Sequence, residues 1–255
     1  MIEPRNFIEK PLQVLSLGFG VQSVSMLIMI EKGIIDRPDV IIHSNTGSEM
    51  PATEELKLEL IPYIQNVLNI PYIEASSFRG ALHEDYASKA AIPMIGIRSC
   101  TLNFKVMPVR REIRKIVGNG KGKILAESWL GITTDESKRE IKSDVMWIQN
   151  KFPLLELNMA RKDCLDLIAE KGWTVEKSGC WLCPYQGKKG FQKLKIQHPD
   201  LFELAVEMEL AMRARRPERK QGFLSRNGGW LTDEEWPENE LQYPSCDDPT
   251  GGCFL

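Results

Sequence analysis

The sequence predicts an α/β fold: a three-layer domain with a mostly parallel sheet over residues 1–175, followed by a smaller cysteine-bearing region of helices and loops over residues 176–255. Three observations predict it. Short apolar runs alternate with longer helical segments, as in βαβ units. Glycines follow the first apolar run, and polar residues follow the second. The chain has 255 residues, 42% of them hydrophobic, which is enough for one large domain and an appendage.

The first element is the stretch Leu12–Leu27, whose pattern predicts a strand, a tight turn and a helix. Gly18 and Gly20 at the turn allow the backbone to approach a ligand closely. The first N–H groups of the following helix lack partners within the helix, and an anion is their natural ligand. The alternative is an ordinary turn whose glycines only relieve a steric problem.

The second unit begins with the apolar run Asp39–His43, which predicts a strand. Polar residues 44–51 follow it, and then a helix over about residues 52–68 and a third strand at Ile70–Glu74. Polar groups at the carboxyl ends of neighbouring parallel strands are where open α/β sheets bind ligands. The single His83 further along is expected at the surface.

Later segments continue the alternation. A helix is expected over residues 108–117, a buried strand over 123–132, a helix over 160–171 and a broken helical stretch over 190–216. Residues 133–139 follow the buried strand. They fit either a phosphate-binding element or a plain helix start capped by Asp135 or Ser137.

Two segments, GFGVQS at 18–23 and SNTGSEMPAT at 44–53, resemble elements of the PP-loop ATP pyrophosphatases and the adenylyl-sulfate reductases, the superfamily that includes phosphoadenylyl-sulfate (PAPS) reductases. The positions that match are Gly20, Ser23, Thr46, Gly47, Pro51 and Thr53. The positions that depart are Gly18, Phe19 and Gln22, where that loop has Ser, Gly and Asp, and Asn45, where the second element has Asp.

This resemblance implies a Rossmann-like fold that binds an adenine nucleotide, either ATP with Mg²⁺ or a sulfated nucleotide (APS or PAPS). It implies a nucleotide site formed by Ser16, Gly18, Phe19, Gly20, Val21, Gln22, Ser23, Asn45, Thr46, Gly47, Gly131 and Glu136. By the same resemblance, Arg139 is expected to act catalytically by stabilising charge on the phosphoryl or sulfate oxygens.

The six cysteines are many for a reducing compartment, where disulfides are rare, so metal ligation or thiol chemistry is the better explanation. Cys180 and Cys183 have the C-x-x-C spacing that directs two thiolates to one metal, and Pro184 follows them. A redox pair is the alternative, but no thioredoxin-like context follows. Sulfur ligands suit zinc and iron-sulfur clusters alike.

The segment that runs from Cys100 through Lys105 to Pro108 resembles the C-C-x-x-x-K-x-x-P element of the sulfonucleotide reductases, with Thr101 in place of the second cysteine. The resemblance implies a 4Fe-4S cluster, with zinc as the alternative. The expected ligands are Cys100, Cys180, Cys183 and Cys253, with Cys246 as another candidate for the fourth. Cys253 near the C-terminus also lies where those reductases carry their nucleophile, so its role as ligand, nucleophile or neither stays open.

The favoured function is ATP-dependent adenylation of a nucleobase or nucleic-acid acceptor with release of pyrophosphate, followed by transfer of sulfur from a donor. One alternative is a sulfonucleotide reductase that uses a thiol reductant and releases sulfite. The other is a non-catalytic subunit that binds nucleotides or nucleic acid through the basic stretches 110–115 and 213–220. The net charge of −2 argues against coating nucleic acid through bulk charge. A cytoplasmic protein with no membrane span is expected, and a homodimer is a further expectation.

Overall fold

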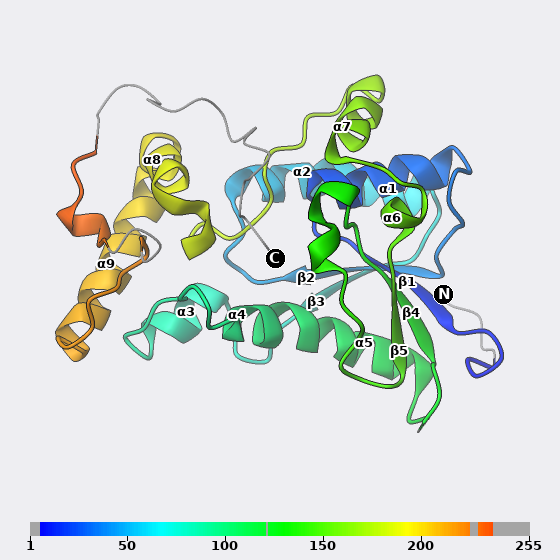
Figure 1. Cartoon of the computed structure of the whole chain (residues 1–255), viewed down its shortest axis with the longest axis horizontal. Coiled ribbons are helices and arrows are strands. Elements are labelled where there is room, and N and C mark those ends of the chain that lie inside the picture. The colour runs from blue at the N-terminus through cyan, green and yellow to red at the C-terminus, as the bar shows by residue number, and fades with distance from the viewer. Residues whose placement is uncertain (1–5, 121, 225–228, 237–255) are drawn as a thin grey trace. The chain divides into compact units, whose positions relative to one another are not determined.

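The computed structural model describes residues 6–120, 122–224 and 229–236. Within them, a sheet of five strands has the order β3-β2-β1-β4-β5, and every neighbouring pair is parallel (Figure 1). The strands are β1 (Leu12–Ser16), β2 (Val40–Asn45), β3 (Tyr72–Ser76), β4 (Ala126–Trp129) and β5 (Ile148–Lys151). The predicted α/β class with a parallel sheet is therefore confirmed.

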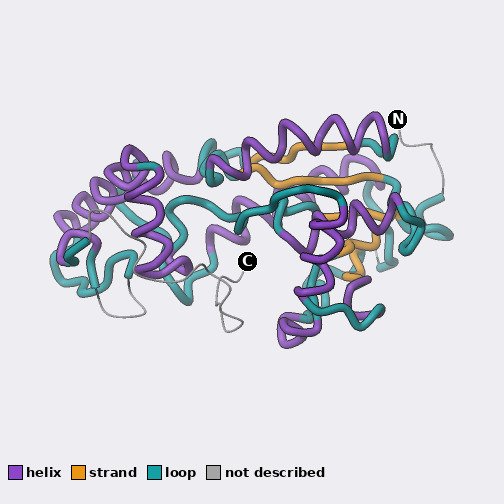
Figure 2. The backbone as a smooth tube through the Cα atoms, turned by 90° about the horizontal axis from the view of Figure 1, so that it is seen from above, coloured by secondary structure: helices purple, strands orange, loops and turns teal. Residues whose placement is uncertain are grey.

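Along the chain, the described α-helices alternate with these strands or follow them. Figure 2 distinguishes helices, strands and loops by colour. They are α1 (Val21–Glu31), α2 (Pro51–Pro62), α3 (Leu82–Ala87), α4 (Ser99–Thr101), α5 (Met107–Val117), α6 (Pro153–Glu156), α7 (Arg161–Glu170), α8 (Gly187–Gln197) and α9 (Pro199–Arg215). None of the described helices is long and apolar enough to cross a membrane.

The described residues form two compact units. The sheet unit consists of those within positions 1–45, 50–76 and 106–178, and the cysteine unit of those within 46–49, 77–105 and 179–255. This grouping differs from the expected division at residue 175. Two earlier segments, 46–49 and 77–105, belong to the same unit as the C-terminal region. This grouping cannot be predicted from the order of the sequence, because the grouping depends on contacts between residues far apart in the chain.

The sheet unit has three layers: helices, the sheet, and a helix on its other face. Alternate residues of β1 point to opposite faces of the sheet, so each face presents apolar side chains that a helical layer covers. Leu15 is buried in a cluster with side chains of α1, α2 and α7, whereas Val14 is buried in another cluster with Ile113 of α5. Both faces of the sheet are covered, as is usual for parallel sheets. Figure 1 shows α1, α2 and α7 on one side of the strands and α5 on the other.

Strand order places β1 in the centre of the sheet, with β2 and β3 on one side and β4 and β5 on the other. The chain thus builds outward from β1 in one direction and then returns to its other side. Ligands of open α/β sheets bind outside the carboxyl ends of the strands at such a switch point. In this sheet the switch point lies between β1 and β4.

The cysteine unit has its own core, in which the rings of Phe191 and Phe223 lie 5.3 Å apart. Glu209 on α9 is buried, and its carboxylate accepts hydrogen bonds from the backbone N–H groups of Phe223 at 2.7 Å and Leu231 at 2.6 Å. These bonds attach the segment after α9 to the helix, and they satisfy a carboxylate that would otherwise be costly to bury.

Candidate functional site

The turn between β1 and α1 lies at the switch point of the sheet. Helix α1 begins after Gly20, whose backbone is extended, without a side-chain cap and without an acidic residue in its first turn. The first N–H groups of a helix have no intrahelical acceptor, and the helix dipole adds positive potential there. The start of α1 is therefore suited to an anion such as a phosphate group.

Internal hydrogen bonds hold this turn in place. The Gly18 N–H donates to Ser23 Oγ at 3.2 Å, and the Ser23 hydroxyl donates to the Gly20 carbonyl at 3.2 Å. Ser23 thus shapes the turn, and both glycines stay close to the helix start. Ser16, the last residue of β1, is half-buried beneath the turn.

Phe19 adopts a positive φ of 53°, which is uncommon for a residue other than glycine. Its ring is fully buried and meets the His43 ring edge-on, with centroids 4.8 Å apart. Val21 is buried as well. These two expected site residues therefore have core side chains, and only their backbone atoms are available to a nucleotide.

Gly131 follows β4 and packs directly on the start of α1. A Cβ atom at this position would lie 3.1 Å from the Ser23 backbone nitrogen and 3.1 Å from the Gln22 Cβ. Two residues later, Thr133 is fully buried, and its hydroxyl has no hydrogen-bond partner among the described residues. A buried hydroxyl of this kind calls for a water or a ligand. The chain segments after β1 and β4 thus meet at the start of α1.

Residues 134–139 form a short 3-10 turn in which Arg139 and Glu136 make an ion pair at 2.6 Å. Glu136 therefore neutralises part of the charge that Arg139 would offer to a phosphate. The expectation that Asp135 or Ser137 caps this segment is wrong, because Thr133 is at the cap position and no side chain caps the turn. Asp135 instead accepts the backbone N–H of Arg161, at the start of α7.

Asn45 ends β2 and belongs to a polar network with β3 and α2. Its side-chain amide donates to Glu74 at 2.8 Å, and the buried Lys57 ammonium lies 2.8 Å from the same carboxylate and 2.9 Å from that of Glu54. Burial acts to raise the pKa of Glu74, but the hydrogen bonds from Lys57 and Asn45 outweigh it, and the pKa is lowered. The network holds Asn45 at the carboxyl end of its strand.

Thr46 and Gly47 belong to the cysteine unit. Thr46 is buried, and its hydroxyl donates to Glu49 at 2.8 Å. Gly47 has a φ of 67°, and a Cβ there would lie 2.8 Å from the Ala81 Cβ, so only glycine fits. The matched element is thus a tight turn packed before α3, and the Thr46 side chain makes a contact within that turn.

His83 on α3 was expected at the surface, but it is half-buried and held in place. Its Nδ1 lies 2.9 Å from Ser48 Oγ, and its ring centroid lies 5.6 Å from that of Trp181. Sequence reasoning missed it because its partners come from segments 35 and 98 residues away. It is a polar side chain beside the C-x-x-C turn.

The thiols of Cys100, Cys180 and Cys183 all lie in the cysteine unit, and none of them forms a disulfide with another described cysteine. The Cys183 N–H bonds the Cys180 carbonyl at 3.1 Å, which closes the expected turn. Burial raises the pKa of the Tyr86 phenol, and Cys100 and Cys180 add to the rise.

The expected metal site is not formed by the described residues. Among them, no three Cys, His, Asp or Glu side chains are grouped so as to hold a metal ion. Cys246 and Cys253, the candidates for the fourth ligand, lie outside the described residues. The thiols of Cys100, Cys180 and Cys183 are donors that suit zinc or an iron-sulfur cluster, but the described residues alone do not group them into a site, and no reaction step below is assigned to a metal.

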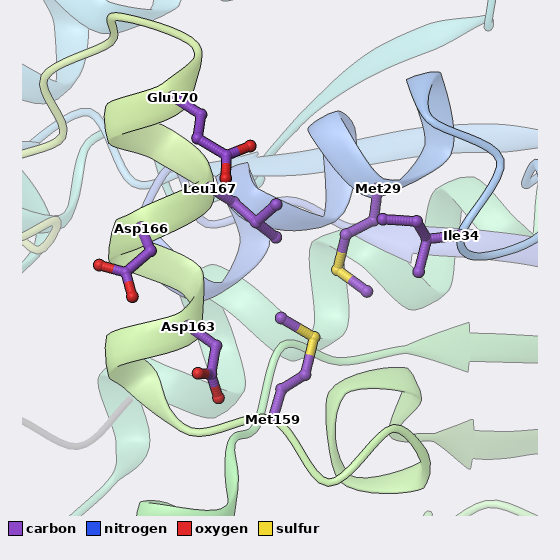
Figure 3. Close-up of a pocket in the computed structure, with 7 residues that line it drawn as sticks. All are labelled: Met29, Ile34, Met159, Asp163, Asp166, Leu167 and Glu170. Atoms are coloured by element: carbon purple, nitrogen blue, oxygen red, sulfur yellow. The ribbon is translucent and has the colours of Figure 1, made fainter.

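A hollow of about 260 Å³ lies along α1 and α7, away from the start of α1 (Figure 3). Met29, which lines it, is eight residues beyond Val21, or about 12 Å along a helix that rises 1.5 Å per residue. Asp163 and Glu170 already have partners, the Ala160 N–H and Lys32. Figure 3 shows Asp166 pointing away from Met29. This hollow is separate from the switch point.

Comparisons with known proteins concern the fold. No protein-family profile matches the sequence, and no curated protein matches it significantly. The fold is similar to that of a PAPS reductase from Candida auris in a phosphate complex, with 16% identity and a TM-score of 0.48 over 67% of this chain and 82% of that chain. It is also similar to the U34-tRNA thiolase NcsA from Methanococcus maripaludis with its [4Fe-4S] cluster, with 14% identity and a TM-score of 0.42 over 85% and 74%.

At 16% and 14% identity the likeness describes the fold. The roles of individual residues rest on the geometry of this chain.

Proposed function

We propose that this chain is an adenine-nucleotide-dependent enzyme of sulfur chemistry, of the PP-loop and PAPS reductase superfamily. One observation carries the proposal: the glycine turn at the uncapped start of α1 lies at the switch point of the sheet, and Gly131 after β4 packs on it. The buried hydroxyl of Thr133 beside it supports the same site.

In the favoured reaction, the turn holds the phosphates of ATP. An oxygen of an acceptor base attacks the α-phosphorus, the bond from that phosphorus to the bridging oxygen breaks, and pyrophosphate leaves. A sulfur nucleophile from a donor then attacks the carbon that bears the adenylated oxygen, and AMP leaves with that oxygen. The N–H groups at the start of α1 and the Arg139 guanidinium would stabilise the charge on the phosphoryl oxygens.

Gln22 stands where the family loop has an acidic residue. Its amide oxygen lies 3.4 Å from an Arg161 guanidinium nitrogen. A neutral side chain beside a cation is a poor ligand for Mg²⁺, which prefers carboxylates. We therefore expect Mg²⁺ to reach this site bound to the nucleotide phosphates.

A second candidate reaction is supported by the segment from Cys100 to Pro108. A cysteine thiolate would attack the sulfur of a sulfated nucleotide, the nucleoside phosphate would leave, and a second thiol would reduce the S-sulfocysteine and release sulfite. Cys253, which the resemblance assigns as nucleophile, lies outside the described residues.

Isothermal calorimetry under anaerobic conditions tests the proposal, with Mg-ATP, APS and PAPS titrated into protein assayed for iron, zinc and labile sulfide. Preferred binding of ATP supports adenylation and sulfur transfer, and preferred binding of a sulfated nucleotide supports the reductase. Absence of binding by all three would overturn both reactions and favour the non-catalytic nucleic-acid-binding subunit.

A further inference from the structure

A second hollow, of about 140 Å³, lies wholly within the cysteine unit. Its lining combines apolar side chains, two hydroxyl groups and two guanidinium groups. Those that the argument uses are Met94, Ile97, Tyr86, Ser99, Arg216 and Arg219. Drug-sized ligands occupy pockets of roughly 300 Å³ or more, so this one suits a single flat ring or one end of a larger molecule.

The wall of the hollow is built from fixed groups. The hydroxyls of Tyr86 and Ser99 are hydrogen-bonded at 2.8 Å. The Ile97 N–H bonds the Met94 carbonyl at 3.3 Å in a tight turn, and the N–H of Gly96 in this turn donates to the Tyr185 hydroxyl at 3.3 Å. A site whose wall is already ordered avoids part of the entropic cost of binding.

The hollow lies next to one of the expected thiol ligands along the chain. Ser99, which lines the hollow, immediately precedes Cys100. A ring bound against Ser99 would therefore lie one residue from a cysteine that the chain offers for chemistry.

The basic stretch 213–220 supplies the positive charge of this hollow. Arg213 pairs with Asp233, and Arg215 bonds the Lys89 carbonyl. Arg216 and Arg219 line the hollow instead, and Arg219 contacts the Met94 sulfur. Within the described part of the chain, neither Arg216 nor Arg219 has an acidic partner. Two guanidinium groups beside an apolar wall suit a ligand with a flat ring and a phosphate.

We propose that this hollow binds one nucleotide unit, with its phosphate on Arg216 and Arg219 and its base against Met94, Ile97 and Tyr86. Bases in single-stranded nucleic acids are bound in this manner, by ring contacts and arginine. The unit belongs either to a nucleic-acid chain or to a free mononucleotide. If the unit belongs to a nucleic-acid chain, the hollow is the acceptor site of the proposed function. That assignment rests on the proposed function.

Fluorescence anisotropy with a labelled single-stranded RNA of mixed sequence, titrated with the full chain at several salt concentrations, tests the proposal. The double variant Arg216→Ala/Arg219→Ala is expected to bind at least about tenfold more weakly, since each lost charged hydrogen bond is worth that much. The salt slope is expected to fall by about one. Lys220→Ala removes one exposed charge of the same stretch outside the hollow, and it should change affinity less than about threefold.

A second variant tests the base contact without changing charge. Ala91→Leu fills the hollow from its wall and is expected to weaken binding at least about tenfold. Its folding is checked by thermal unfolding, and Mg-ATP calorimetry on the same variants reports the β1–α1 site separately. Loss of RNA binding with intact ATP binding supports the hollow. RNA binding without ATP binding leaves the hollow standing and removes the favoured adenylation reaction of the proposed function.

Competition by AMP identifies the source. If AMP displaces the RNA only at AMP concentrations at least about a hundredfold above the dissociation constant of the RNA complex, the result supports a nucleic-acid chain. If AMP displaces the RNA at concentrations comparable to that constant, the result supports a free mononucleotide. The proposal is overturned if RNA and AMP both fail to bind, or if the arginine pair and Ala91→Leu bind as the parent chain does.

Discussion

Gly131 and Ser23 approach so closely that a Cβ atom on Gly131 would lie 3.1 Å from the Ser23 backbone nitrogen. The two residues are 108 positions apart in sequence, and the side-by-side pairing of β1 and β4 brings them together. This contact packs the segment after β4 against the start of α1 at the switch point of the sheet.

Gly131→Ala is expected to lower the free energy of unfolding by about 1–3 kcal/mol, because the added methyl group overpacks against backbone that cannot rotate away. It should also weaken nucleotide binding by displacing the start of α1. Urea denaturation and calorimetry measure the two effects. Gly33→Ala is the control, since it adds strain at a φ of 67° after the other end of α1 without any new contact. Equal loss of binding in both variants would show that the contact has no special role.

Gly18→Ala is expected to fold normally and to lose nucleotide affinity at least about tenfold. The nearest atom to the added Cβ is Ser23 Oγ at 4.0 Å, so the protein has room for it, whereas a phosphate group on the turn would not. Thermal unfolding and calorimetry check the two parts. Unchanged affinity would remove Gly18 from the site.

Gly20→Ala needs a companion variant, because its Cβ would lie 2.7 Å from Ser178 Oγ. The double variant Gly20→Ala/Ser178→Ala removes that clash and is expected to recover stability while nucleotide affinity stays low. Recovery of affinity together with stability would show that the single variant acts through Ser178 and not by crowding a ligand.

The pH dependence of stability is expected to reflect Glu74. Its pKa in the folded protein lies below the ordinary value of 4.5, so its contribution is present above that value and is lost as pH falls through the folded pKa. Lys57→Met should lower the free energy of unfolding by about 1–2 kcal/mol at pH 7. The loss is smaller than for a fully buried ion pair because the Glu74 side chain is 36% exposed and solvent screens the pair. The cost should shrink below pH 4, where the carboxylates become protonated. Urea denaturation at both pH values measures it, and a cost independent of pH would contradict the ion-pair explanation.

The cysteine assignments predict a shared loss of metal. Cys100→Ala, Cys180→Ala and Cys183→Ala should each release the same bound metal, measured by elemental analysis after anaerobic purification. Cys164→Ala is the matched control, because Cys164 is fully buried in the core of the sheet unit, where burial raises the pKa of its thiol. Retention of metal by any of the first three variants would remove that residue from the site.

Local patterns were sufficient to predict the strand, turn and helix that begin in Leu12–Leu27, the turn at Cys180–Cys183, and a strand at Asp39–His43 that forms as Val40–Asn45. These elements depend on apolar periodicity, glycine conformations and short-range hydrogen bonds, all of which neighbouring residues determine. Phe19 was assigned to the nucleotide from its place in the motif, although its apolar ring is better accommodated in the core.

The α/β class and the glycine turn at the end of the first strand can be predicted from the amino-acid sequence, because both follow from local periodicity and backbone sterics. Tertiary structure decided that β4 lies beside β1, that Gly131 contacts the start of α1, and that the segments 46–49, 77–105 and 179–255 share one unit. It also brought Arg216 and Arg219 to the same hollow as Tyr86. Such neighbours are selected by burial and packing among residues far apart in the chain, and no local pattern encodes them.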